Sequence, residues 1–154
     1  AEHPQLPVAS RLCSDGYAAE NMTVIEQGVL KNFILSRYGA ARTGFPRSGN
    51  YGGATVFGSG ETPLDELIAG VQKGILMGRF SGGSPSPAGD LSGVAKNSFL
   101  IENGKVTKAL SEVMISGNLA DMLRDVAAVS RERECSGYWL LPWVRVQGVT
   151  ISGK

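Results

Sequence analysis

Apolar residues gather in three pairs of short segments, and a dipeptide that ends in glycine separates the members of each pair. The segments are 22–26 with 29–35, 94–102 with 105–115, and 139–146 with 149–152. The dipeptides are Gln27-Gly28, Asn103-Gly104 and Gln147-Gly148. Glycine adopts the positive φ of a tight turn without steric cost, and Asn-Gly is a strong hairpin signal. The pattern predicts three β-hairpins, with Glu102 facing Lys105 beside the second turn.

A first helix is predicted where apolar residues follow helical spacing. The positions i, i+3, i+4 and i+7 of this stripe are Leu64, Leu67, Ile68 and Val71. Thr62 can cap the helix, Pro63 suits its first position, and Asp65 completes a capping box. Gly74 is expected to end it, and 74–80 to continue as a strand.

A second helix is predicted after Asn118, which is a favourable N-cap residue, with Asp121 in the first turn. Its apolar stripe is Leu119, Met122, Leu123 and Val126. Glycine, serine and proline predict loops over 36–62, with an apolar patch at 54–57, and over 81–93. The sum is an α+β fold, a mainly antiparallel β-sheet with hairpins and two short packed helices. Residues 22–154 are expected to form one domain, and 1–21 an extended lead-in left from a longer chain.

Composition narrows the possible partners. The chain has 154 residues, 42% of them apolar, and a net charge of +1. Such a charge creates no broad field that would attract nucleic acid or an anionic membrane. The sequence has no apolar run of about 18 residues, so no membrane-spanning helix is expected. The 21 glycines are not periodic and favour a turn-rich, mostly β domain.

The sequence carries no complete catalytic, metal or nucleotide motif. Its single histidine, His3, is expected to be a solvated residue in the N-terminal segment rather than a metal ligand. Cys13 and Cys135 lie far apart, which favours two reduced thiols, and Cys135 is interpreted as a half-buried packing residue. Asp90 is the acidic residue whose glycine- and proline-rich surroundings invite a functional hypothesis, although loop acids are more often turn formers.

Three arginines, Arg37, Arg42 and Arg47, lie near aromatic residues in the region 36–62. Basic and aromatic residues together can bind single-stranded nucleic acid. Without a lysine cluster the pattern is weak, so the arginines are interpreted as part of a solvated loop or of a surface that contacts another chain.

Short motifs in a fixed order give the chain a resemblance to the carboxy-terminal domain of the TldD/PmbA family, closest to the PmbA branch. The motifs lie at 27–33, 43–44, 48–50, 64–68, 74–76, 82–83, 89–93, 99–104, 115–119, 141–142 and 148–153. Each motif is weak alone, but their order and spacing over nearly the whole chain make the resemblance specific.

The resemblance implies a cytoplasmic peptidase system in which two subunits, TldD-like or identical, enclose a cavity that takes peptide substrates. One kind of subunit binds zinc through a His-Glu-x-x-x-His helix, which this chain lacks, and the family is also described as a modulator of DNA gyrase. A cysteine near the carboxy terminus completes the zinc shell in that branch, and Cys135 matches its position. No cofactor is expected in this chain alone, because Cys135 would need histidines from elsewhere.

The leading hypothesis is a domain of a zinc metallopeptidase assembly without a complete site of its own. Its substrate groove is expected at Gly82, Gly83, Asp90 and Ser92, because glycine lets backbone approach an extended peptide. The alternatives are a peptide- or protein-binding module without hydrolysis and, third, an accessory of DNA gyrase or nucleic acid. No membrane partner is expected.

Overall fold

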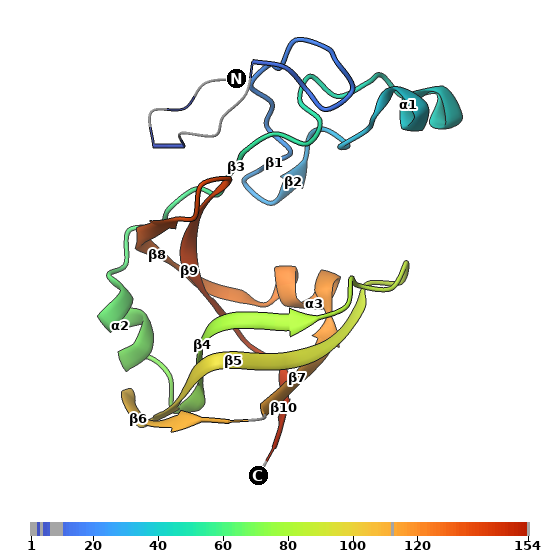
Figure 1. Cartoon of the computed structure of the whole chain (residues 1–154). Coiled ribbons are helices and arrows are strands. Elements are labelled where there is room, and N and C mark those ends of the chain that lie inside the picture. Colours follow the sequence, from blue (N-terminus) through green and yellow to red (C-terminus); the bar gives the residue numbers. More distant parts are fainter. Residues whose placement is uncertain (1–2, 4, 7–10, 112, 154) are drawn as a thin grey trace. The chain divides into compact units, whose positions relative to one another are not determined.

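The computed structural model describes residues 3, 5–6, 11–111 and 113–153 (Figure 1). That part of the chain has three short helices and ten strands, and its sheets are mainly antiparallel. The predicted α+β class is therefore confirmed, with one helix more than expected. The chain divides into two compact units, unit 1 (1–57 and 134–141) and unit 2 (58–133 and 142–154). None of the described helices is long and apolar enough to cross a membrane.

Unit 1 contains the first predicted hairpin. Strand β1 (Ile25–Glu26) pairs antiparallel with β2 (Val29–Leu30), so both strands are shorter than predicted. Gln27 and Gly28 between them have φ values of 50° and 79°. The hairpin that the dipeptide Gln27-Gly28 predicted is therefore confirmed, and both turn residues have positive φ.

Helix α1 (Arg37–Thr43) lies in unit 1 where a loop was predicted, so that prediction was wrong. The helix follows Ser36, whose hydroxyl accepts a hydrogen bond from the Gly39 N–H at 3.1 Å. It ends at Gly44, which has a φ of 75°. None of the residues of α1 is buried, so the sequence has no apolar stripe that predicts this helix. Its only local sequence signals are the two capping residues, Ser36 and Gly44.

A three-stranded sheet contains β3 (Thr55–Val56), β9 (Trp139–Val146) and β8 (Val126–Cys135), in that order. β3 pairs in parallel with the first residues of β9. The apolar patch predicted at 54–57 thus contains a short strand of this sheet. The hydrophobic pattern did not single out β8, whose second half is the charged run from Arg131 to Glu134.

The main sheet of unit 2 is built around one long strand, β5 (Asp90–Glu102). β4 (Lys73–Gly82) pairs with one edge of β5. Along the other edge, β7 (Val113–Asn118) pairs with the first half of β5 and β6 (Lys105–Leu110) pairs with the second half. The second predicted hairpin is confirmed, with Glu102 opposite Lys105. The predicted strand 105–115 is divided, because its two parts pair with different halves of β5.

The third predicted hairpin is wrong. β10 (Thr150–Ser152) pairs antiparallel with β7 in the main sheet, whereas β9 belongs to the sheet of β3 and β8. The N–H of Gln147 donates to the carbonyl of Asp125 at 3.1 Å instead of closing a turn between two paired strands. Gly148 still has a φ of 72°, so the local conformation fits a turn while the strand partners are set by tertiary contacts.

Helix α2 (Leu64–Ala69) is present, but its predicted ends are wrong. Pro63 precedes the helix without a side-chain cap, and the Leu64 N–H donates to Oε2 of Glu132 at 2.9 Å. Thr62 forms an isolated parallel β-bridge with Ser130 of β8, so β8 holds the backbone of Thr62. The helix ends at Gly70 rather than at Gly74, because β4 already begins at Lys73.

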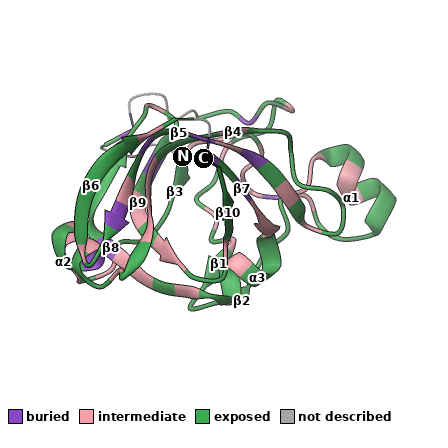
Figure 2. Cartoon of the chain, turned by 90° about the horizontal axis from the view of Figure 1, so that it is seen from below, coloured by how far each residue is buried: buried purple, intermediate pink, exposed green. Residues whose placement is uncertain are grey.

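Helix α3 (Leu119–Arg124) begins as predicted. The side chain of Asn118 accepts a hydrogen bond from the Ala120 N–H at 3.0 Å, and Asp121 pairs with Arg124 at 2.8 Å. Buried positions are few along the part of the ribbon that the structure describes (Figure 2). In unit 2 the buried apolar residues are Leu67, Ala95, Ile101, Val113 and Ile115.

Candidate functional site

The four predicted groove residues gather at one end of the main sheet of unit 2, where β4 ends and β5 begins. Gly82 is the last residue of β4 and pairs with Gly93 of β5. Ser92 precedes Gly93, and Asp90 lies two positions earlier on the same face of β5. Gly83 follows β4 directly. The structure therefore brings together the residues that the sequence analysis grouped.

Gly82 is required by the packing of the protein itself. A Cβ atom there would lie 2.6 Å from Cζ of Phe80 and 2.7 Å from the carbonyl oxygen of Ser92. A Cβ on Gly93 would lie 2.5 Å from the same ring carbon. The Phe80 ring thus covers both glycines of the pair, and this contact already explains why Gly82 is a glycine.

Gly83 differs from Gly82 because no neighbouring group of the described chain requires a glycine at this position. A Cβ there would meet no heavy atom within 4 Å, and its φ lies outside the left-handed region. The residue is exposed in the segment between β4 and β5. No contact within the described chain therefore explains why this position is a glycine.

Asp90 is the first residue of β5 rather than a loop residue, which corrects the predicted loop boundary. Its carboxylate accepts a hydrogen bond from Nδ2 of Asn118 at 3.0 Å, and the same amide donates to the carbonyl of Ala88 at 2.9 Å. The N–H of Asp90 donates to Oγ of Ser86 at 3.1 Å. Asp90 thus ties the 86–90 turn to the N-terminus of α3. Ser92 is exposed and lies opposite Ser116 of β7.

A free strand edge leads into this group of residues. β4 stands at one end of the strand order of its sheet, so its outer edge pairs with no other strand of the described chain. The edge extends over ten residues from Lys73 to Gly82. Unpaired N–H and C=O groups on such an edge can bind an extended peptide as an additional strand. The sequence analysis missed this edge, because strand order is not visible in a hydrophobic pattern.

Cys135 and His3 both contact the backbone of Gln5 in unit 1. The Cys135 thiol donates to the Gln5 carbonyl at 3.1 Å, and the Gln5 N–H donates to Nδ1 of His3 at 3.2 Å. His3 is half-buried rather than solvated, and Cys135 is exposed rather than half-buried. Both cysteines are free. Within the described residues, no three side chains of the types that bind metals lie together as a site.

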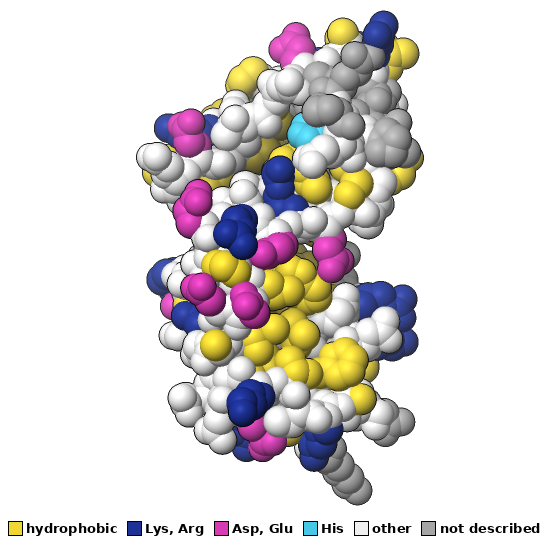
Figure 3. All heavy atoms as spheres, turned by 90° about the vertical axis from the view of Figure 1, so that its left-hand side faces the viewer, with side chains coloured by type: hydrophobic (Ala, Val, Ile, Leu, Met, Phe, Trp, Pro, Cys, Tyr) yellow, Lys and Arg dark blue, Asp and Glu magenta, His cyan; other side chains and the backbone are white. Residues whose placement is uncertain are grey.

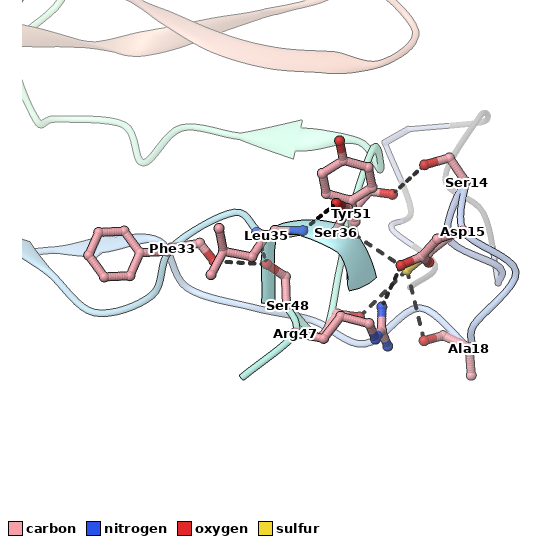
Figure 4. A network of polar contacts seen from close by, with 12 residues as sticks. Ser14, Asp15, Ala18, Phe33, Leu35, Ser36, Arg47, Ser48 and Tyr51 are labelled. Atoms are coloured by element: carbon pink, nitrogen blue, oxygen red, sulfur yellow. Dashed lines mark hydrogen bonds and ion pairs between the residues drawn. The ribbon is translucent and has the colours of Figure 1, made fainter. Parts of the chain in front are cut away.

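Arg47 is not part of a solvated loop, which corrects one of the predictions. Its guanidinium lies 3.5 Å from the Asp15 carboxylate and 4.2 Å from the centre of the Tyr17 ring. Ser48 beside it is buried, donates to the Phe33 carbonyl at 2.8 Å and accepts from the Leu35 N–H (Figure 4). The other two arginines, Arg37 and Arg42, are exposed on α1. These contacts hold the loops of unit 1 together.

Comparison of the sequence with known proteins identifies the family of this chain. Residues 2–153 match the model of the PmbA/TldA metallopeptidase C-terminal domain. The chain belongs to this family. It is 32% identical to the metalloprotease PmbA of Escherichia coli O157:H7 and 26% identical to a zinc metalloprotease TldD homolog of Saccharolobus solfataricus, with 96% and 85% of the chain aligned. The resemblance drawn from the sequence motifs is thereby confirmed.

A solved structure from Bacteroides thetaiotaomicron, described as a candidate modulator of DNA gyrase, matches the fold of this PmbA/TldA domain. Its TM-score is 0.83 with 33% identity, over 97% of the chain and 34% of the solved chain. The two metalloproteases are covered over 35% and 32% of their length. The chain thus spans about a third of the relatives that it matches.

Proposed function

We propose that this chain acts as the C-terminal domain of a PmbA- or TldD-type subunit in a cytoplasmic zinc metallopeptidase assembly, where it binds peptide without a complete catalytic site of its own. The family match over residues 2–153 carries the proposal, and the metalloprotease names of two relatives support it. Because the chain spans about a third of those relatives, cleavage is expected to need further polypeptide, supplied by a TldD-like or identical subunit.

The free edge of β4 supports peptide binding. A peptide that adds to this edge forms main-chain hydrogen bonds, which do not depend on its side chains. Its path would end beside Gly82 and Gly83, near Asp90 and Ser92. Gly83 leaves open space at that point, so a peptide backbone can come close without displacing any group of the described chain.

Zinc is the metal that the name of the TldD homolog implies. A protein zinc site takes three or four ligands from His, Cys, Asp and Glu, and a bound zinc polarises a carbonyl or activates water. Cys135 is exposed, so its thiolate can serve as one ligand if histidines of another segment or subunit hold the ion. This chain would then contribute one ligand and the peptide-binding edge, and no reaction step follows from its residues alone.

A cleavage assay with the reconstituted assembly tests the proposal. The chain, within its full-length subunit, is combined with a TldD-like subunit and an unfolded peptide. Gly83→Ala should lower kcat/KM about tenfold, because a methyl group intrudes where the peptide backbone lies. Gly58→Ala is the matched control, since its Cβ also meets open space outside this region. Equal cleavage by the two variants contradicts a groove at Gly83, and lack of any cleavage contradicts the peptidase function.

The β4 edge also favours the second candidate, a peptide-binding module without hydrolysis. Peptide binding to an edge strand needs no metal, so it should persist when a chelator removes zinc. Binding with no cleavage in any reconstituted assembly would favour this candidate over the peptidase.

A further inference from the structure

An apolar groove in unit 2 lies between α2 and β9. Side chains from α2, β4, β5 and β9 line it, and its free volume is about 60 Å³. Leu67 and Ile101 of the lining are buried, with 4% and 3% of their surface exposed, whereas Ile68 and Trp143 are half-buried. Figure 3 looks onto the side on which α2 lies and shows hydrophobic side chains gathered there. The groove is therefore partly open, and its free volume, about that of two water molecules, can enclose only the tip of a bound side chain, the rest of which would lie over the open mouth.

Arg145 of β9 is the one charged residue in the lining of this groove. Its Nη1 donates to the carbonyl of Leu67 at 3.4 Å, while its Nε is hidden from solvent and has no hydrogen-bond partner. No carboxylate of the described residues forms an ion pair with Arg145. A half-buried guanidinium without an anion is costly, because lost hydration is not replaced by a charge partner.

Capping of α2 accounts for only part of this arrangement. A cation near the C-terminus of a helix interacts favourably with the last carbonyls. Here the helix has six residues, and the one contact, to Leu67, is long. The remaining donors of the guanidinium have no acceptor in the described chain.

We propose that this groove binds the C-terminal residue of a peptide, with its carboxylate on Arg145 and its apolar side chain beside Ile68, Val71 and Trp143. Because Nε is hidden from solvent, the carboxylate would meet the terminal Nη1 and Nη2 groups, which can donate two parallel hydrogen bonds, and the apolar walls favour an aliphatic side chain. Charge complementarity thus selects an anionic end, and the apolar lining favours a hydrophobic group beside it. The choice of a peptide as source of the carboxylate rests on the proposed function, whereas carboxylate recognition does not.

Trp143 supplies the readout. In a Trp139→Phe background it is the sole tryptophan of the 154-residue sequence, and its fluorescence is followed during titration. The probes are N-acetyl-Ala-Ala-Leu, its C-terminal amide, and isovalerate, which has a similar side chain and carboxylate without a peptide. The peptide acid should bind about tenfold more tightly than the amide, as expected for loss of a charge-assisted hydrogen bond. Equal binding of acid and amide overturns the proposal, and tighter binding of isovalerate overturns the peptide as ligand.

Arg145→Met keeps the length of the apolar stem and removes the charge, so it should abolish the preference for the acid. Arg131→Met is the control, because Arg131 is exposed on β8 outside this groove. An unchanged preference in Arg145→Met overturns the proposal. If circular dichroism shows that this variant is unfolded, Arg145→Lys, which loses the fork, should reduce the preference several-fold. These experiments measure binding and not cleavage. A negative result therefore does not contradict the proposed peptidase function, and a negative cleavage assay does not contradict carboxylate binding at Arg145.

Discussion

The glycine pair beneath Phe80 provides a direct test of the packing in unit 2. In Gly82→Ala the new Cβ would lie 2.6 Å from the Phe80 ring and 2.7 Å from the Ser92 carbonyl oxygen. Non-bonded carbon atoms prefer separations of about 3.5 to 4.0 Å, so the methyl group intrudes by about 1 Å. The ring can move, because Phe80 is 36% exposed, but the Ser92 carbonyl belongs to the backbone of β5.

Overpacking of this kind costs about 1 to 3 kcal/mol. Replacement of a glycine by alanine also restricts the unfolded chain, which returns about 0.4 to 1 kcal/mol. The net loss for Gly82→Ala is therefore expected to be about 1.3 kcal/mol, within limits of about 0 and 2.6 kcal/mol. Gly83→Ala meets no atom within 4 Å, so only the favourable contribution applies and its stability should rise slightly.

Urea unfolding followed by circular dichroism measures both variants. A lower midpoint with an unchanged m-value for Gly82→Ala indicates a loss of stability rather than a change in the unfolded state. In a Phe80→Ala background the cost of Gly82→Ala should fall but persist, because the ring contact is gone and the carbonyl contact remains. A Gly82→Ala chain as stable as Gly83→Ala would refute the packing argument.

Two further substitutions test single polar contacts by the same unfolding measurement. Ser48→Ala removes the hydroxyl that joins Phe33 to Leu35 and leaves a backbone N–H unpaired, so a loss of about 1 to 3 kcal/mol is expected. Ser14→Ala, an exposed hydroxyl with one contact, is the control and should cost less than half as much. Asn118→Ala removes the cap of α3 and the link to Asp90 and should cost about 1 to 2 kcal/mol. Asn118→Ser keeps a capping oxygen but cannot reach both partners, so an intermediate loss is expected; equal stability of Ser and Ala variants would show that the cap contributes nothing.

The sequence by itself determined the features whose physics is local. The turns at Gln27-Gly28 and Asn103-Gly104 need positive φ at both residues, and both dipeptides accept it. Asn118 caps α3 through an N–H two residues away, so the cap was visible in the residue order. The ordered motifs identified the family. Residues 82, 83, 90 and 92, for which a groove remains a prediction, lie at one end of the main sheet because β4 and β5 are consecutive antiparallel strands.

Only the tertiary structure decided the features that depend on distant residues. Glu132 caps α2 across 68 positions, and β7 rather than β9 provides the partner of β10. Asp90 is held by Asn118, 28 residues later, which no local pattern indicates. The β4 edge that no described strand pairs with, and the Arg145 guanidinium that no described carboxylate pairs with, likewise follow from strand order and packing. The physical reason is that turns and caps involve neighbouring residues, whereas strand partners, edges and buried charges are set by which segments meet after folding.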